Sequence, residues 1–227
     1  MNINKQIFYT TVILMFTIVL FGITDLDLVI QDYFYNFTTH SWIVNRDAQP
    51  YKFIFYDGAK KLLIFIAILA LFSLLFIKFS KIIREYKKGI IIFVLSAIFV
   101  PFVTITLKRY TNMPCPKNEI HYNGTMIRTA VWEQYPLKYA RMPHIKCWPA
   151  GHASAGFALL SLFFFFKTRR NRFIALGSAL TIGWIMGLYK MLIGDHFLSH
   201  TVITMILAWL IILIIVKITN KKQVLYE

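Results

Sequence analysis

The stretch that decides the fold class is GIIIFVLSAIFVPFVTITL, residues 89–107, which contains no charged side chain. A helix of about 20 apolar residues spans the roughly 30 Å hydrocarbon core of a bilayer. Basic residues flank the stretch on both sides, Lys88 before it and Lys108 after it. The stretch therefore predicts a transmembrane helix near the centre of the chain.

Five further stretches are apolar and long enough to qualify: residues 7–24, 62–79, 152–166, 173–193 and 198–216. Hydrophobic residues make up 58% of the 227 residues, and the mean hydropathy is +0.60. A soluble fold of this size has too little interior to bury so many. We therefore expect an all-α, polytopic membrane protein, a six-transmembrane-helix bundle. We expect one domain over residues 1–227, with its motif-bearing core at about 89–216.

Most of the net charge of +15 lies in the short connections and at the chain ends. These segments hold only Glu85 and Glu227 as acidic residues, against the basic residues Lys5, Lys78, Lys81, Arg84, Lys87, Lys88, Lys167, Arg169, Arg170, Arg172, Lys217, Lys221 and Lys222. Positively charged connections stay in the cytoplasm, so both termini are expected there, and the loops at about 25–60 and 108–150 are expected outside. This charge reports topology and argues against a nucleic-acid partner.

The second outward loop carries a smaller excess of positive charge. Glu119 and Glu133 are outnumbered there by Lys108, Arg109, Lys117, Arg128, Lys138, Arg141 and Lys146. The positive-inside rule predicts depletion of basic residues outside, so topology does not explain the excess. It suits a negatively charged substrate, although solvated side chains or contacts with lipid phosphates would give the same composition. The acidic residues of the first outward loop are expected to be solvated or to cap helices: Asp25, Asp27 and Asp32.

Three short clusters lie at successive junctions between an outward loop and a predicted helix. The first is KRYTNMPCP, residues 108–116, and the second is WPAGHAS, residues 148–154. In the second, Pro149 and Gly151 predict a tight turn into a helix, whose first N–H groups form an anion site beside His152.

The third cluster contains YK at residues 189–190 and GDHFLSH at residues 194–200. If a helix begins at Asp195, His196 and His200 lie on one face of it. A histidine so placed can act as a nucleophile or base when a second group orients its ring. Each cluster alone is a weak signal, but all three fall at one predicted membrane face.

The clusters resemble the motifs of the type 2 phosphatidic acid phosphatases, which are six-span, metal-independent membrane phosphatases. The family pattern is Lys-x6-Arg-Pro, then Pro-Ser-Gly-His, then Ser-Arg-x5-His-x3-Asp. The chain looks like a divergent bacterial branch of this family, and the resemblance covers its second half. The matching positions are Lys108 and Pro116, then Pro149, Gly151 and His152, then His196.

The resemblance implies a role for each matching residue. The imidazole of His196 would attack phosphorus and form a phosphohistidine, His152 would protonate the leaving alkoxide, and His200 would orient His196. Basic side chains and backbone amides would hold the phosphoryl oxygens, at Lys108, Ala150, Gly151 and Lys190. No metal and no cofactor is implied.

Four positions depart from the family pattern. Cys115 stands in place of the first Arg, Ala150 of the Ser, Tyr189-Lys190 of Ser-Arg, and His200 of the Asp. Lys190 keeps the charge without the bidentate fork of arginine. A neutral His200 could accept a hydrogen bond from His196, with Asp195 in partial support. The arginine missing at position 115 could be supplied by Arg109, Arg128 or Arg141.

The two cysteines, Cys115 and Cys147, lie in the same outward loop, one in the first cluster and one just before the second. Both would face an oxidising compartment in a diderm bacterium, so we expect a disulfide between them. Two unpaired thiols are the alternative.

Together these features predict a metal-independent phosphatase in the bacterial inner membrane, with its active site facing the periplasm. Its partners are the bilayer and a lipid with a phosphate headgroup. The candidate substrates are lipid A phosphate, polyprenyl diphosphate, phosphatidylglycerol phosphate and phosphatidic acid. One alternative is a metal-dependent hydrolase that uses His196 and His200, with His152 or Asp195 as a further ligand. Another is a catalytically weak relative that binds or transports lipid.

Overall fold

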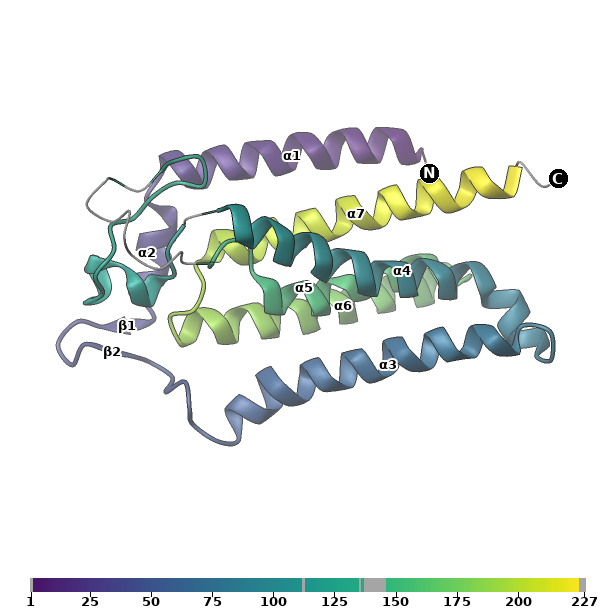
Figure 1. Cartoon of the computed structure of the whole chain (residues 1–227), viewed down its shortest axis with the longest axis horizontal. Coiled ribbons are helices and arrows are strands. Elements are labelled where there is room, and N and C mark those ends of the chain that lie inside the picture. The colour runs from purple at the N-terminus through teal and green to yellow at the C-terminus, as the bar shows by residue number, and fades with distance from the viewer. Residues whose placement is uncertain (1, 112, 135, 137–145, 225–227) are drawn as a thin grey trace.

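The computed structural model describes residues 2–111, 113–134, 136 and 146–224 and consists mainly of helices (Figure 1). The α-helices are α1 (Ile3–Ile23), α2 (Leu26–Asp32), α3 (Ala59–Ser73), α4 (Lys81–Tyr110), α5 (Gly151–Ala158), α6 (Arg169–Leu192) and α7 (Leu198–Val224). A π-helical segment, Phe53–Gly58, leads into α3, and 3-10 segments follow α3 (Leu74–Phe76) and α5 (Leu159–Phe164). Strands β1 (Tyr35–Asn36) and β2 (Ser41–Trp42) form one antiparallel hairpin. The predicted all-α, polytopic fold class is confirmed.

Five helical segments are long and apolar enough to cross a membrane: Ile3–Ile23, Phe53–Phe76, Lys81–Tyr110, Arg169–Leu192 and Leu198–Asn220. The predicted span at residues 152–166 corresponds to a shorter apolar helix, Gly151–Phe164. Its α-helical and 3-10 parts together rise only ~24 Å at the usual rise per residue. The described residues therefore give five full-length spans, and the predicted count of six is not confirmed.

Side-chain caps fix where several helices begin. The side-chain oxygens of Asn2, Ser80 and Thr168 accept hydrogen bonds from backbone N–H groups in the first turns of α1, α4 and α6. Such caps satisfy donors that have no partner within the helix. The second span begins at Phe53, which is nine residues before residue 62, the start predicted from the sequence. Lys60, expected in a loop, consequently lies on the first turn of α3.

The core lies among α4, α5, α6 and α7. The short helix α5 packs closely on α6, where a Cβ added to Gly156 would lie 2.7 Å from Gly183 Cα. Small residues allow such close helix contacts within membranes. In the most apolar window of α7, 56% of the residues are buried, whereas none is buried in the corresponding window of Phe53–Phe76. Helix α7 is therefore central, and α3 is the most peripheral element.

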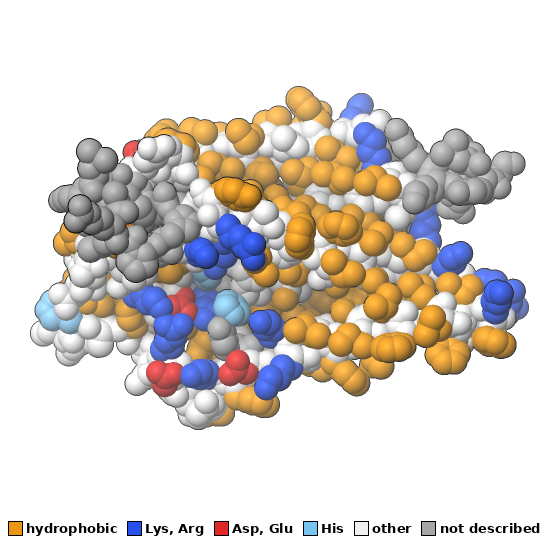
Figure 2. Space-filling view, in the orientation of Figure 1, with side chains coloured by type: hydrophobic (Ala, Val, Ile, Leu, Met, Phe, Trp, Pro, Cys, Tyr) orange, Lys and Arg blue, Asp and Glu red, His pale blue; other side chains and the backbone are white. Residues whose placement is uncertain are grey.

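The two ends of the molecule differ in composition. The start of α1, the end of α7, the α3–α4 connection and the start of α6 lie at one end of the bundle, and α2, β1 and β2 lie at the other (Figure 1). Hydrophobic side chains cover the long side seen in Figure 2, Lys and Arg gather toward both ends, and Asp, Glu and His are seen toward the hairpin end. The residues of the three sequence clusters lie at the end that carries the hairpin.

Candidate active site

The fold brings the three clusters together at the hairpin end of α4, α5 and α7. Lys108 is in the last turn of α4, Gly151 opens α5, and a Cβ added to Gly151 would lie 3.6 Å from the Lys108 Nζ. The Thr111 hydroxyl donates to the Trp148 carbonyl at 2.7 Å, which ties the end of α4 to the segment before α5. The first and second clusters are thus adjacent in space.

The two histidines of the third cluster form a pair. His196 Nδ1 lies 3.2 Å from His200 Nδ1, and both side chains are buried. One ring must donate and the other accept in such a contact. If His196 donates, its Nε2 carries a lone pair, and His200 is the acceptor. Burial, with Lys108 as the next cause, holds the pKa of His196 well below its usual range, so the ring is neutral and nucleophilic.

Asp195 sits between the histidine pair and a group of cationic side chains. Its carboxylate accepts hydrogen bonds from Lys117 Nζ at 2.7 Å and Lys190 Nζ at 2.8 Å, and Arg46 Nη2 lies 3.6 Å away. Burial raises the pKa of Asp195, but Lys190 and Lys117 outweigh it, and the net pKa lies below the ordinary value. Asp195 therefore holds three cations beside His196.

The first turn of α5 supplies backbone donors. Ala150 N–H donates to the Thr204 hydroxyl at 2.8 Å and also approaches the His200 carbonyl at 3.3 Å. Those bonds use the amide of Ala150 within the protein and fix α5 against α7. The next amides, from Gly151 onward, belong to the first helical turn, whose N–H groups have no partner within the helix. They suit an anion better than Ala150 does.

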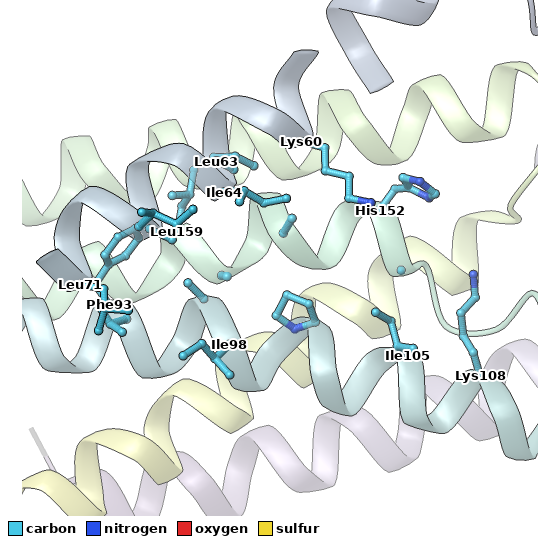
Figure 3. Close-up of a pocket in the computed structure, with 18 residues that line it drawn as sticks. Lys60, Leu63, Ile64, Leu71, Phe93, Ile98, Ile105, Lys108, His152 and Leu159 are labelled. Atoms are coloured by element: carbon cyan, nitrogen blue, oxygen red, sulfur yellow. The ribbon is translucent and has the colours of Figure 1, made fainter. Parts of the chain in front are cut away.

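A cavity of about 450 Å³ lies between α3, α4 and α5, and Lys108, Gly151 and His152 are among the residues that line it. Lys60, Lys108 and His152 project toward one end of it, and Leu71 and Phe93 lie at the other (Figure 3). Apart from these polar residues and Gly151, its lining consists of aliphatic and aromatic side chains and a proline. The cavity thus combines a cationic end with an apolar body.

A family model described as the PAP2 superfamily matches residues 89–223, more than half of the chain. The chain belongs to the PAP2 superfamily. The matched segment contains all three clusters, so the family resemblance seen in the sequence is confirmed. No curated protein and no solved structure matches the chain.

A disulfide joins Cys115 to Cys147, the two cysteines expected from the sequence to pair. The bond links the loop after α4 to the residue before Trp148. Cys147 Sγ lies 3.6 Å from His196 Nδ1, so the disulfide packs against the histidine pair. It ties the segments that carry the first and second clusters together at the site.

The same disulfide bears on the metal alternative. Among the described residues, the cluster that could hold a metal ion is Cys147, His196 and His200. The sulfur of Cys147 is bonded to Cys115, so it offers no thiolate, the form in which cysteine binds metal. The two histidines alone fall short of the three protein ligands of a catalytic zinc site. His152 and Asp195 are not in this cluster.

The three arginines expected to supply the charge missing at position 115 have different outcomes. Arg128 donates toward Asp25 and the Thr24 carbonyl, at the end of α1. Arg109 is exposed on the last turn of α4, and Arg141 lies outside the described residues. Sequence reasoning missed Lys60 and Arg46 as neighbours of the site, and it named Lys117 only as part of the positive charge of the second predicted outward loop. A signal was present, because Arg46, Lys52 and Lys60 are basic residues in the stretch predicted to be the first outward loop.

Two carboxyl groups outside the three clusters are buried. Asp27 in α2 accepts hydrogen bonds from Ser199 N–H at 2.8 Å and Ser199 Oγ at 2.5 Å, so it caps the start of α7, as one reading of the sequence expected. Burial raises the pKa of Asp27 to about 6, against these bonds. Glu119 is 1% exposed, and its carboxyl oxygens have no hydrogen-bond partner among the residues that the structure describes. Burial raises the pKa of Glu119 to about 8.

Proposed function

We propose that the protein is a metal-independent phosphatase that removes phosphate from the headgroup of a membrane lipid. The observation that carries the proposal is the cavity between α3, α4 and α5, with Lys60, Lys108 and His152 at one end and an apolar lining beyond. A lipid phosphate has the same division into an anionic head and an apolar chain. Membership of the PAP2 superfamily supports the same class of substrate.

The chemistry follows from the arrangement of the two histidines. His196 Nε2 attacks phosphorus while its Nδ1 proton is held by His200, and the bond from phosphorus to the lipid oxygen breaks. His152 gives its proton to that oxygen. It then takes a proton from the water that attacks the phosphohistidine, which releases inorganic phosphate. A dianionic phosphate beside His152 favours the protonated ring that the first step needs.

Binding of the phosphoryl group falls to cations and backbone amides. Lys108 and Lys190 supply charge, and Gly151 with the amides that follow it supplies donors at a helix start. Ala150, whose N–H is bonded to Thr204, acts by fixing the start of α5. Such positioned charge is the main contribution a protein makes to phosphoryl transfer.

The proposal includes an orientation. The basic connections place both termini in the cytoplasm of a bacterium by the positive-inside rule. The site at the opposite end of the bundle then faces the periplasm. The inner membrane is the location, and the lipid reaches the cavity from the bilayer.

The test is release of inorganic phosphate by purified protein in lipid nanodiscs from phosphatidic acid, phosphatidylglycerol phosphate, polyprenyl diphosphate and lipid A phosphate. We expect release from at least one of them, unchanged by EDTA and blocked by vanadate. Release from none would leave a lipid-binding or transport role, and loss of activity with EDTA would favour the metal-dependent alternative.

A further inference from the structure

A second cavity of about 260 Å³ lies beside Lys190, and the mechanism above leaves it unused. Its lining consists of Arg46, Lys52, Tyr189, Lys190 and Ile193. Arg46 and Lys52 precede the segment that the PAP2 model matches, which begins at residue 89. The family motifs therefore assign this cavity no role.

The loop that carries Arg46 is anchored to the end of α6. Val44 N–H donates to the Leu192 carbonyl at 3.4 Å, and the Tyr189 hydroxyl donates to the Arg46 carbonyl at 3.5 Å. Lys52 is held by an ion pair with Asp47 at 2.7 Å. The two cationic side chains are thus placed at the cavity by contacts of their own segment and of α6.

Positive charge exceeds negative charge around this cavity. Four cationic side chains, Arg46, Lys52, Lys117 and Lys190, share two carboxylates, Asp47 and Asp195. Asp57 adds a smaller attraction on Lys52. The side chains of Arg46 and Lys52 are 52% and 37% exposed, so an anion can reach them from solvent. An anionic ligand would balance the remaining charge.

Lys190 connects this cavity to the reaction centre. It lines the cavity, and its ammonium group donates to Asp195, the residue before His196. An anion held by Arg46, Lys52 and Lys190 therefore lies next to the phosphoryl group on which His196 would act. A guanidinium group at position 46 can hold two phosphate oxygens at once.

We propose that this cavity, the Arg46–Lys52 subsite, binds a second phosphate group of the lipid headgroup. The inference rests on the proposed function and narrows its substrate to lipids with two phosphates. The second phosphate is either joined to the first as a diphosphate or esterified elsewhere on the headgroup. In both cases the shared ligand is a second phosphate beside the scissile one.

The test compares three substrates with the same chain: a monophosphate, a diphosphate and a headgroup with two separate phosphates. The variants are Arg46→Gln, Lys52→Gln and the double variant. Arg84→Gln is the control, because it removes one charge from an exposed position at the opposite end. We expect the double variant to lose about 10- to 100-fold in kcat/KM on one or both two-phosphate substrates, the scale of lost hydrogen bonds to charged groups. On the monophosphate it should stay within about 2-fold.

A direct binding measurement separates failure of the subsite from failure of the proposed function. Methylenediphosphonate and inorganic phosphate are titrated into wild-type protein and the same variants. We expect the diphosphonate to bind more tightly to wild type, and the double variant to lose that preference whether or not any lipid is hydrolysed. The subsite would be overturned if the double variant lost affinity equally for mono- and two-phosphate ligands, if Arg84→Gln lost as much affinity, or if the double variant lost none. If the variants bind the diphosphonate as wild type does and still hydrolyse lipid phosphate, the subsite is wrong and the phosphatase proposal stands.

Discussion

Helices α4–α7 and the segment that precedes them contribute differently to the molecule. The first group contains the main core and is almost entirely covered by the PAP2 match. In the preceding segment, the most apolar parts of α1 and of Phe53–Phe76 are only 6% and 0% buried. Yet that segment supplies Lys60 to one cavity, Arg46 and Lys52 to another, and Asp27 to the start of α7.

In the proposed function, the reacting groups and the groups that recognise the substrate lie in different parts of the chain. Both histidines proposed to react belong to the segment that the PAP2 model matches, His152 in α5 and His196 between α6 and α7. Residues from the preceding segment, by contrast, line the two cavities. A peripheral segment can change its side chains at little cost to the core, because few of its apolar residues are buried. We therefore expect substitutions in α4–α7 to abolish turnover, and those before residue 89 to change substrate use or stability.

The largest effect is expected for His196→Ala. Removing the nucleophile should lower kcat by on the order of 10³-fold or more, as loss of a nucleophile does elsewhere. The measurement is phosphate release with saturating lipid. His121→Ala is the matched control, because His121 is a half-exposed histidine that pairs with Asp32. Activity equal to wild type in His196→Ala would show that the matched helices do not perform the chemistry in this way.

Asp27→Ala should be the most damaging change in the preceding segment. It removes the carboxylate that accepts both Ser199 bonds, and a buried donor left without a partner costs about 1–3 kcal/mol. Thermal unfolding in detergent should show a lower Tm, and kcat should fall because α7 carries His200. Asp25→Ala is the control, since the Asp25 side chain is 83% exposed. Equal Tm values for the two variants would contradict the capping role.

Lys60→Ala should raise KM by about 5- to 10-fold, the scale of one charge-assisted contact, with a smaller change in kcat. Lys60 lies at the cationic end of the large cavity beside Lys108 and His152. Its exposed neighbour Lys61 does not line that cavity, so Lys61→Ala serves as the control. If both variants raise KM equally, Lys60 acts only through general positive charge at this face.

Glu119→Gln tests a smaller effect that depends on pH. Burial raises the pKa of Glu119 from 4.5 to about 8, so the fold favours the protonated carboxyl. The stability that this proton gives is complete below pH 4.5 and is lost as the pH rises through about 8. The Gln variant cannot ionise, and its Tm should exceed that of wild type at pH 9 and match it at pH 5.

The control for that comparison is Glu133→Gln, which changes a glutamate at the exposed surface. It should leave the Tm difference between pH 5 and pH 9 as it is in wild type. A wild-type Tm that does not fall between these two pH values would contradict burial of an ionisable Glu119.

The sequence predicted the spans well where apolar runs are bounded by caps and charges. Ser80 and Thr168 precede α4 and α6, and the apolar stretch at 89–107 falls wholly within α4. The prediction failed at residues 53–61, because Asp57, Lys60 and Lys61 lower the hydropathy of a segment that is nonetheless helical. That a single domain covers residues 1–227 stays a prediction.

The site was predictable in its residue types and unpredictable in its partners. Local patterns singled out His152, His196 and Lys108, because helix starts and histidine spacing are visible in a few residues. The contact of Asp27 with Ser199 joins positions 172 residues apart, and a single sequence carries no signal for it. The amide of Ala150 donates to the Thr204 hydroxyl, 54 residues further along the chain, and a single sequence carries no signal for this contact either. The place of Ala150 among the phosphate ligands stays a prediction.

The central claim, that His196 carries the phosphoryl group, is tested most directly by trapping the covalent intermediate. Wild-type and His152→Ala proteins are mixed with lipid substrate labelled in the scissile phosphate, quenched in base and analysed by peptide mass spectrometry. The account predicts an acid-labile, base-stable phosphate on His196 and none in His196→Ala. Rapid turnover with no label on His196, or label on another residue, would contradict it.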